Sequence, residues 1–265
     1  MLIGLLQMEP AAADPARNLA RIENAARSAA ASGAELMVSP EMSLTGYAIG
    51  ADIARLAEPR DGAMVGALRQ MAAAFGLALL AGFPERDGEH VYNSVVLAKP
   101  DGTSIFYRKC HLYGPDEKAH FSPGDALPPL FEIGGFKAGL LICYDIEFPE
   151  MVRGLALAGA ELVLVATALA ATPCCRRIAE TIVPARALEN HVFIAYADLC
   201  GTERGLAYQG DSSIVGPDGE VLARAGRSDA LLLARLDRSA YSDVVAEVPY
   251  LAERRPDLYR RFPQA

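Results

Sequence analysis

Short apolar runs of about five to eight residues recur along this 265-residue chain, and stretches with helical spacing separate many of them. The runs at 2–7 and 35–39 flank an Ala-rich helical stretch at 15–32, which predicts a β-α-β opening. Such runs are too short to cross a membrane, because a spanning helix needs about 20 apolar residues. The same pattern predicts further helices and strands at 62–75, 77–83, 91–98, 104–108, 129–133, 137–142, 149–159, 161–166 and 192–197. The alternation therefore predicts an α/β fold.

Two turn signals show that the sheets are not purely parallel. Lys-Pro-Asp-Gly at 99–102 and Gly-Pro-Asp-Gly at 216–219 each connect two adjacent strand-like runs. Strands joined by a tight turn run antiparallel, so we expect mixed sheets. No Pro-, Ser- or Gly-rich linker divides the chain, which predicts a single domain over 1–265.

The charge of the chain excludes several classes of partner. Its 33 acidic and 25 basic residues give a net charge of -8, and no basic run is longer than two arginines. Neither nucleic acid nor an anionic membrane surface is an expected partner. The opening run has no positively charged segment before it and ends at Glu9-Pro10, so it predicts a buried strand rather than an export signal, and hence a cytoplasmic protein.

The cysteines indicate chemistry rather than cross-linking. The chain has five, without paired CxxC spacing, which argues against a disulfide framework or a structural zinc site. We therefore expect at least one thiol to be used in a reaction. The five are Cys110, Cys143, Cys174, Cys175 and Cys200.

Cys143 lies where a predicted strand, 137–142, gives way through a short turn to a helix beginning at Pro149. A strand that ends in a nucleophile followed by a turn exposes the side chain, and backbone N–H groups just beyond it can bind an oxyanion. An ordinary buried cysteine would fit the same pattern.

Two charged residues also follow predicted strands. Glu41 comes directly after an apolar run, where desolvation could raise its pKa toward that of a general base. Lys109 ends the strand at 104–108 and could lower the pKa of a thiol or bind an oxyanion. Taken singly, the glutamate could be a helix-capping acid and the lysine a solvated strand end.

Together, in the order Glu, Lys, Cys, these segments resemble the nitrilase superfamily of carbon-nitrogen hydrolases. The resemblance runs from Leu2 to about Leu236. It rests on Pro-Glu-Met at 40–42 with Thr-Gly-Tyr at 45–47, on Arg-Lys-Cys-His-Leu at 108–112, and on Cys-Tyr-Asp-Ile-Glu-Phe-Pro-Glu at 143–150. It implies an α/β fold of four layers, an αββα sandwich with two mixed β-sheets.

The resemblance also implies roles for particular residues. Glu41, Lys109 and Cys143 match the catalytic residues, Glu117 matches a supporting glutamate, and the backbone N–H of Tyr144 would bind the oxyanion. The implied reaction hydrolyses a small aliphatic amide to a carboxylic acid and ammonia through a cysteine thioester, with no metal or cofactor. An N-carbamoyl amidase, a nitrilase, and a catalytically idle scaffold or binding subunit remain alternatives.

Within the superfamily, the segment around Cys143 looks most like that of bacterial aliphatic amidases, including those acting on 5-aminopentanamide. Candidate substrate-binding residues are Tyr47, Asp145, Glu147, Thr167 and Ala168. The two acids would suit a substrate with a distal ammonium, although salt-bridged structural residues would look the same. Cys174, Cys175, Arg176 and Arg177 receive no role.

The C-terminal segment 241–265 is interrupted by three prolines yet carries apolar side chains, and we expect it to be extended. Exposed apolar residues of this kind favour packing on a partner subunit. We expect a homodimer or a higher even-numbered homo-oligomer, the alternative being that the tail folds back on its own subunit.

Overall fold

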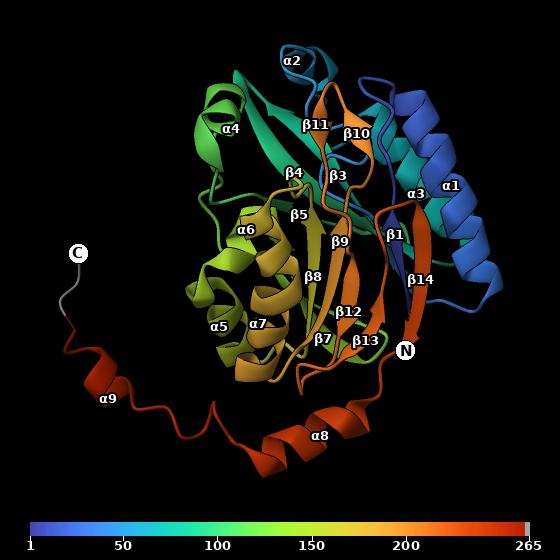
Figure 1. Ribbon diagram of the computed structural model, residues 1–265. Coiled ribbons are helices and arrows are strands. Elements are labelled where there is room, and N and C mark those ends of the chain that lie inside the picture. The colour runs from blue at the N-terminus through green and yellow to red at the C-terminus, as the bar shows by residue number, and fades with distance from the viewer. Residues whose placement is uncertain (263–265) are drawn as a thin grey trace.

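The computed structural model describes residues 1–262 and places two six-stranded sheets face to face (Figure 1). The first sheet consists, in spatial order, of β14 (Ala230–Arg235), β1 (Leu2–Gln7), β2 (Leu36–Val38), β3 (Ala78–Asp87), β4 (His90–Ala98) and β5 (Ser104–Arg108). The second consists of β13 (Val221–Arg224), β12 (Ser213–Val215), β9 (Phe193–Asp198), β8 (Leu162–Thr167), β7 (Phe136–Ile142) and β6 (Leu130–Ile133). A separate two-stranded hairpin joins β10 (Thr202–Glu203) to β11 (Leu206–Ala207).

Both sheets are mixed, as the turn signals predict. In the first, β1, β2 and β3 are parallel, while β4, β5 and β14 pair antiparallel with their neighbours. In the second, β7, β8 and β9 are parallel and the remaining pairs are antiparallel. The parallel strands end at the same edge of each sheet, and the residues that follow them are therefore brought together.

Helices cover the outer face of each sheet (Figure 1). The first sheet is covered by α1 (Pro15–Ala31) and α3 (Ala63–Phe75), and the second by α5 (Pro149–Leu157), α6 (Pro173–Arg177) and α7 (Val183–Asn190). In α1 the side chain of Asp14 caps the first turn, Pro15 fits its first position, and Ile22, Ala26 and Ala29 bury one face against the sheet. The architecture is the predicted four-layer αββα sandwich.

Three apolar layers hold this sandwich together. Side chains from both sheets interdigitate in the central layer, which includes Leu5, Leu80, Leu140 and Leu164. Separate clusters fill the space between each sheet and its helices. The inner strands, such as β1, β8 and β9, are buried on two faces and are therefore mostly apolar rather than alternating, which is why they could be recognised in the sequence.

Some elements differ from the expectations. The sequence did not predict the edge strand β14 or the hairpin of β10 and β11, nor the short helices α2 (Asp52–Leu56) and α4 (Gly114–His120). The prediction that the chain is extended from residue 241 is wrong for its first part, since α8 (Arg238–Glu247) runs through residues 241–247 and a short α9 (Pro256–Tyr259) follows. Residues 263–265 of the predicted tail lie outside the described residues.

Candidate active site

The three residues with predicted catalytic roles lie just beyond the ends of strands. Glu41 follows β2, Lys109 follows β5 and Cys143 follows β7. Glu41 and Lys109 have no solvent exposure, and Cys143 is 8% exposed. A buried ammonium and carboxylate must be paired to be tolerated, so their contacts define the site.

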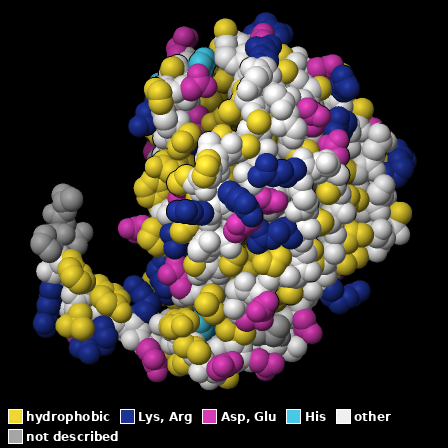
Figure 2. Space-filling model, viewed as in Figure 1, with side chains coloured by type: hydrophobic (Ala, Val, Ile, Leu, Met, Phe, Trp, Pro, Cys, Tyr) yellow, Lys and Arg dark blue, Asp and Glu magenta, His cyan; other side chains and the backbone are white. Residues whose placement is uncertain are grey.

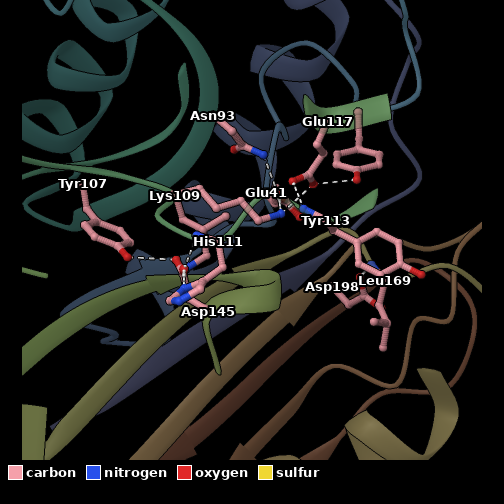
Figure 3. Close-up of polar contacts among 12 residues, drawn as sticks. Glu41, Asn93, Tyr107, Lys109, His111, Tyr113, Glu117, Asp145, Leu169 and Asp198 are labelled. Atoms are coloured by element: carbon pink, nitrogen blue, oxygen red, sulfur yellow. Dashed lines mark hydrogen bonds and ion pairs between the residues drawn. The ribbon is translucent and has the colours of Figure 1, made fainter. Parts of the chain in front are cut away.

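Glu41 is held by a close approach of its backbone to β3. A Cβ on Gly82 would lie 2.2 Å from the Met42 nitrogen, so only glycine lets this loop lie against the strand. Oε1 of Glu41 accepts hydrogen bonds from Lys109 Nζ at 2.8 Å and from Asn93 Nδ2 at 2.6 Å (Figure 3). Oε2 is buried and has no hydrogen-bond partner among the described residues. One oxygen of this carboxylate is thus fixed, and the other is available to accept a proton.

Lys109 lies between two carboxylates. Its Nζ donates to Glu41 Oε1 and, at 2.6 Å, to Glu117 Oε1 (Figure 3). Burial alone would lower the pKa of Lys109, but the charges of Glu41, Cys143 and Glu117 raise it above its ordinary value. The residue is therefore a charged ammonium.

Glu117, on α4, organises the other side of the ammonium. Its Oε1 also accepts the Tyr47 hydroxyl at 2.7 Å, and its Oε2 accepts the Tyr113 backbone N–H at 2.7 Å. With Lys109 this makes three donors to one buried carboxylate. The sequence-predicted Glu117 is thus in direct contact with Lys109.

Cys143 occupies a strained turn between β7 and α5. Its φ is 45°, in the left-handed region that residues other than glycine rarely adopt, and a short 3-10 helix, η1 (Cys143–Glu147), follows. Burial, and then the charge of Glu41, raise the pKa of the thiol well above its ordinary value, although Lys109 lowers it. The resting thiol is protonated and needs a base to become a nucleophile.

Glu41 has the properties of such a base. Burial raises its pKa above the ordinary value, against the opposing effect of Lys109. A carboxylate whose pKa is raised toward neutrality is a stronger proton acceptor than an exposed one.

The carboxylate of Asp145 is engaged by contacts within the protein, and its expected role in substrate binding stays a prediction. It has no exposed surface, and its carboxylate accepts hydrogen bonds from the Tyr107 hydroxyl, the Ile142 N–H and both the backbone and the ring Nδ1 of His111 (Figure 3). The imidazole is also stacked on Phe148, with ring centroids 3.9 Å apart. Asp145 therefore fastens the turn that carries Cys143 to the segment after β5.

A cavity of about 310 Å³ opens onto the thiol. Of the predicted substrate-binding residues, Tyr47, Glu147 and Ala168 line it together with Tyr144. Thr167 does not line it, since its side chain is fully buried one residue before the cavity wall. The remaining lining residues are Tyr113, Gly114, Pro115, Asp116, Leu169, Ala170, Cys175 and Leu206.

Several of these residues could not be identified from the sequence. Tyr113 reaches the cavity from the residue before α4, Cys175 from α6 and Leu206 from β11, and these elements are far apart along the chain. Asn93 did carry a signal, because it and Ser94 are polar residues within the mostly apolar run at 91–98, and buried polar side chains need partners.

Two general properties complete the description. Within residues 1–262, no group of three or more His, Cys, Asp or Glu side chains could hold a metal ion. No helix in the same range is both long and apolar enough to cross a membrane.

A buried cysteine on a strand-to-helix turn, with a carboxylate and an ammonium beside it at one end of an αββα sandwich, defines a cysteine hydrolase. Residues 2–244 match the family described as carbon-nitrogen hydrolase. The chain belongs to this family, and the family, fold and amidohydrolase class expected from the sequence are confirmed.

Relatives and solved structures agree with this assignment. The chain is 44% identical to a "hydrolase in pqqF 5′ region" of Pseudomonas protegens, over 98% of this chain and 90% of that protein. It is 38% identical to an (R)-stereoselective amidase of Pseudomonas sp., over 96% and 92%. A structure of an amidase from Nesterenkonia sp. AN1 superposes with a TM-score of 0.89 at 38% identity, covering 99% of this chain and 97% of that one. That structure is of the E41L mutant of the amidase, in which the acetamide moiety of fluoroacetamide is covalently added at the active site cysteine.

Proposed function

We propose that this protein hydrolyses small aliphatic amides to carboxylic acids and ammonia through a thioester on Cys143. The observation that carries the proposal is the pair of oxygens of Glu41. Oε1 is fixed by Lys109 and Asn93, whereas Oε2 is buried without a partner among the described residues, near a thiol that needs a base. In the E41L mutant of the Nesterenkonia amidase the active site cysteine carries the acetamide moiety of fluoroacetamide, which supports a nucleophilic cysteine next to a site that admits a small amide.

In the first half of the reaction, Glu41 Oε2 accepts the proton of the Cys143 thiol as the sulfur adds to the amide carbonyl carbon. Negative charge develops on the carbonyl oxygen. The Lys109 ammonium and the Tyr144 backbone N–H stabilise it, because fixed donors aimed at a developing charge need no reorganisation during the reaction. Glu41 then returns the proton to the departing nitrogen, the C–N bond breaks and ammonia leaves.

In the second half, water hydrolyses the thioester. A glutamate accepts the proton of the attacking water, the tetrahedral species collapses, and the thiolate leaves and is reprotonated. Glu117 has a supporting role, because its contacts with Lys109 and Tyr47 keep the ammonium aimed at the oxyanion. Each proton that is taken is returned, so the protein is unchanged after one cycle.

N-carbamoyl amidase and nitrilase activities use the same three residues and remain the alternatives. Similar proteins are named as amidases, which supports an amide as the substrate. An ammonia assay with a panel of linear amides, ureido compounds and nitriles tests the choice. Ammonia from amides alone supports the proposal, carbon dioxide from ureido compounds indicates the carbamoyl branch, and no turnover of any of them indicates an idle subunit. Intact mass spectrometry during turnover should detect an acyl group on Cys143.

Glu147 supports a finer proposal about the substrate. It lines the cavity, no hydrogen bond or ion pair within residues 1–262 engages its carboxylate, and the lining includes no lysine or arginine. We expect amides with a distal ammonium to react faster than amides with a distal carboxylate. Glu147→Gln should remove the preference, whereas Glu150→Gln, which removes a charge outside the cavity, should not.

For the assembly, we propose a homodimer or a higher even-numbered oligomer. Figures 1 and 2 draw the segment of α9 apart from the main body, with hydrophobic side chains on it, and Leu258 and Tyr259 are about 40% exposed. Closer to the body, Tyr250 meets the ring of His191 and Leu251 packs against the cluster outside the second sheet. The tail thus packs in part on its own subunit, and the exposed apolar side chains of α9 favour packing on a partner. A cytoplasmic location stays a prediction from the sequence.

A further inference from the structure

The hairpin of β10 and β11 inserts a buried carboxylate behind the wall of the cavity. Glu203, on β10, is 1% exposed. Its Oε2 accepts the backbone N–H groups of Tyr47 at 2.9 Å and Ala48 at 2.6 Å, and the hydroxyl of Tyr208 at 2.6 Å. No cation pairs with it among residues 1–262, so these three donors stabilise the buried charge.

The loop that Glu203 holds has a shape that only glycine permits. Gly46 has a φ of +93°, and a Cβ there would lie 1.9 Å from Glu203 Oε1. The loop and the carboxylate are therefore in direct contact on both sides of Tyr47. A side chain at position 46 would push the carboxylate away from the N–H groups it accepts.

Tyr47 connects this loop to the catalytic cluster. Its ring lines the cavity and meets the ring of Tyr208 edge-on, with centroids 6.4 Å apart. Its hydroxyl donates to Glu117 Oε1, the same oxygen that accepts from Lys109 Nζ. A continuous series of contacts thus leads from Glu203 through Tyr47 and Glu117 to the ammonium.

We propose that Glu203 is a positioning residue of the amidase reaction, which fixes Tyr47 so that Glu117 holds Lys109 at the oxyanion. This inference rests on the proposed function. Glu203 touches neither the cavity nor the thiol, and Leu206, on the facing strand of the hairpin, forms part of the cavity wall. The hairpin therefore both walls the cavity and sets its catalytic geometry. Misplacing a catalytic group by about 1 Å costs on the order of 100-fold in rate.

Kinetics of Glu203→Gln on a small neutral amide test the proposal. The neutral amide side chain is a weaker acceptor for the three donors, so we expect kcat to fall by about 10- to 100-fold. KM should change by less than about threefold, because the contact matters most in the transition state. Glu161→Gln is the matched control: this glutamate, just before β8, accepts the Lys137 N–H and pairs with Arg238, far from the cavity.

A double-mutant cycle with Tyr47→Phe shows whether Glu203 acts through the tyrosine. If it does, adding Glu203→Gln to Tyr47→Phe lowers kcat by less than about threefold, since the connection is already broken. Additive losses, or a loss in kcat no greater than that of Glu161→Gln at equal loss of thermal stability, overturn the proposal. Should Glu203→Gln not fold, Tyr208→Phe removes one donor and must show the same non-additivity. A wild type that releases no ammonia from any amide refutes the proposed function instead.

Discussion

Replacing Lys109 by methionine removes the single positive charge from a buried group of two carboxylates. Methionine has a similar length and no charge, so packing is largely kept while Glu41 and Glu117 lose the ammonium that lies 2.8 Å and 2.6 Å from their oxygens. Two carboxylates that share a buried site cannot both stay ionised, and one of them must take up a proton.

The expected loss of folding stability follows from the burial of the three charged groups. Removing one partner of a buried ion pair destabilises a protein by about 3–5 kcal/mol. For a chain of this size that corresponds to a fall in Tm on the order of 10 °C. The surface control is Lys137→Met, which should cost less than about 1 kcal/mol, because within residues 1–262 this ammonium donates only to the Ala158 carbonyl.

The loss of folding stability in Lys109→Met should increase with pH. Without Lys109, the pKa of one buried carboxyl rises further than the wild-type pKa of Glu41 already does. A carboxyl whose folded-state pKa lies above its unfolded value adds stability below the unfolded pKa, and this is lost as pH rises through the folded pKa. The deficit against wild type should therefore be larger at pH 8 than at pH 5.

Urea unfolding at the two pH values, together with ammonia release, measures both effects. Methionine should abolish turnover at each pH, because the oxyanion loses its cation. Lys109→Arg should recover part of the stability and little of the turnover, since a planar guanidinium cannot place one donor where the ammonium lies. A deficit below about 1 kcal/mol, or one that is independent of pH, would refute the charge balance described above.

Three further predictions concern the thiol, its base and the assembly. Cys143→Ala should abolish ammonia release with little change in Tm, because alanine at a φ of 45° is no more strained than cysteine; any retained turnover contradicts the mechanism. The acid limb of kcat/KM should lie above the ordinary carboxyl range, since Glu41 must be ionised to accept the proton and its pKa is raised; a profile flat down to that range would show that another group is the base. Light scattering should give an even multiple of the subunit mass, and deleting residues from Tyr241 onward should lower it. A single-subunit mass refutes the oligomer, and an unchanged multiple shows that the tail only folds back.

The parts of the fold that could be predicted are those whose side chains are buried on both faces. The run at 137–142 is apolar after Lys137, and the structure places the almost wholly buried β7 there. The half-buried edge strand β5, at 104–108, was found instead from the turn signal that precedes it. The edge strand β14 was missed although its sequence contains three consecutive leucines, one of them 38% exposed. The helix α8 was hidden by the prolines that follow it, since only residues beyond Glu247 are interrupted.

In the candidate site, the catalytic residues could be predicted because each follows a strand. Closeness in sequence to Cys143 did not predict which residues line the cavity. Glu41, Lys109 and Cys143 could be selected because each follows a strand, and parallel strands bring their ends together. Asp145 is only two residues from the thiol, yet it does not line the cavity, and its carboxylate accepts the Tyr107 hydroxyl instead. Glu203 gave no local signal, because its partners near Tyr47 are more than 150 residues away.

The size of the cavity also limits which amide bonds can reach the thiol. The thiol lies at the inner wall of a space of about 310 Å³, near the lower limit for small-ligand pockets. A folded polypeptide cannot thread its backbone into such a space, so peptide bonds never reach the sulfur. The volume of the cavity thus selects small free amides over the peptide bonds of folded proteins.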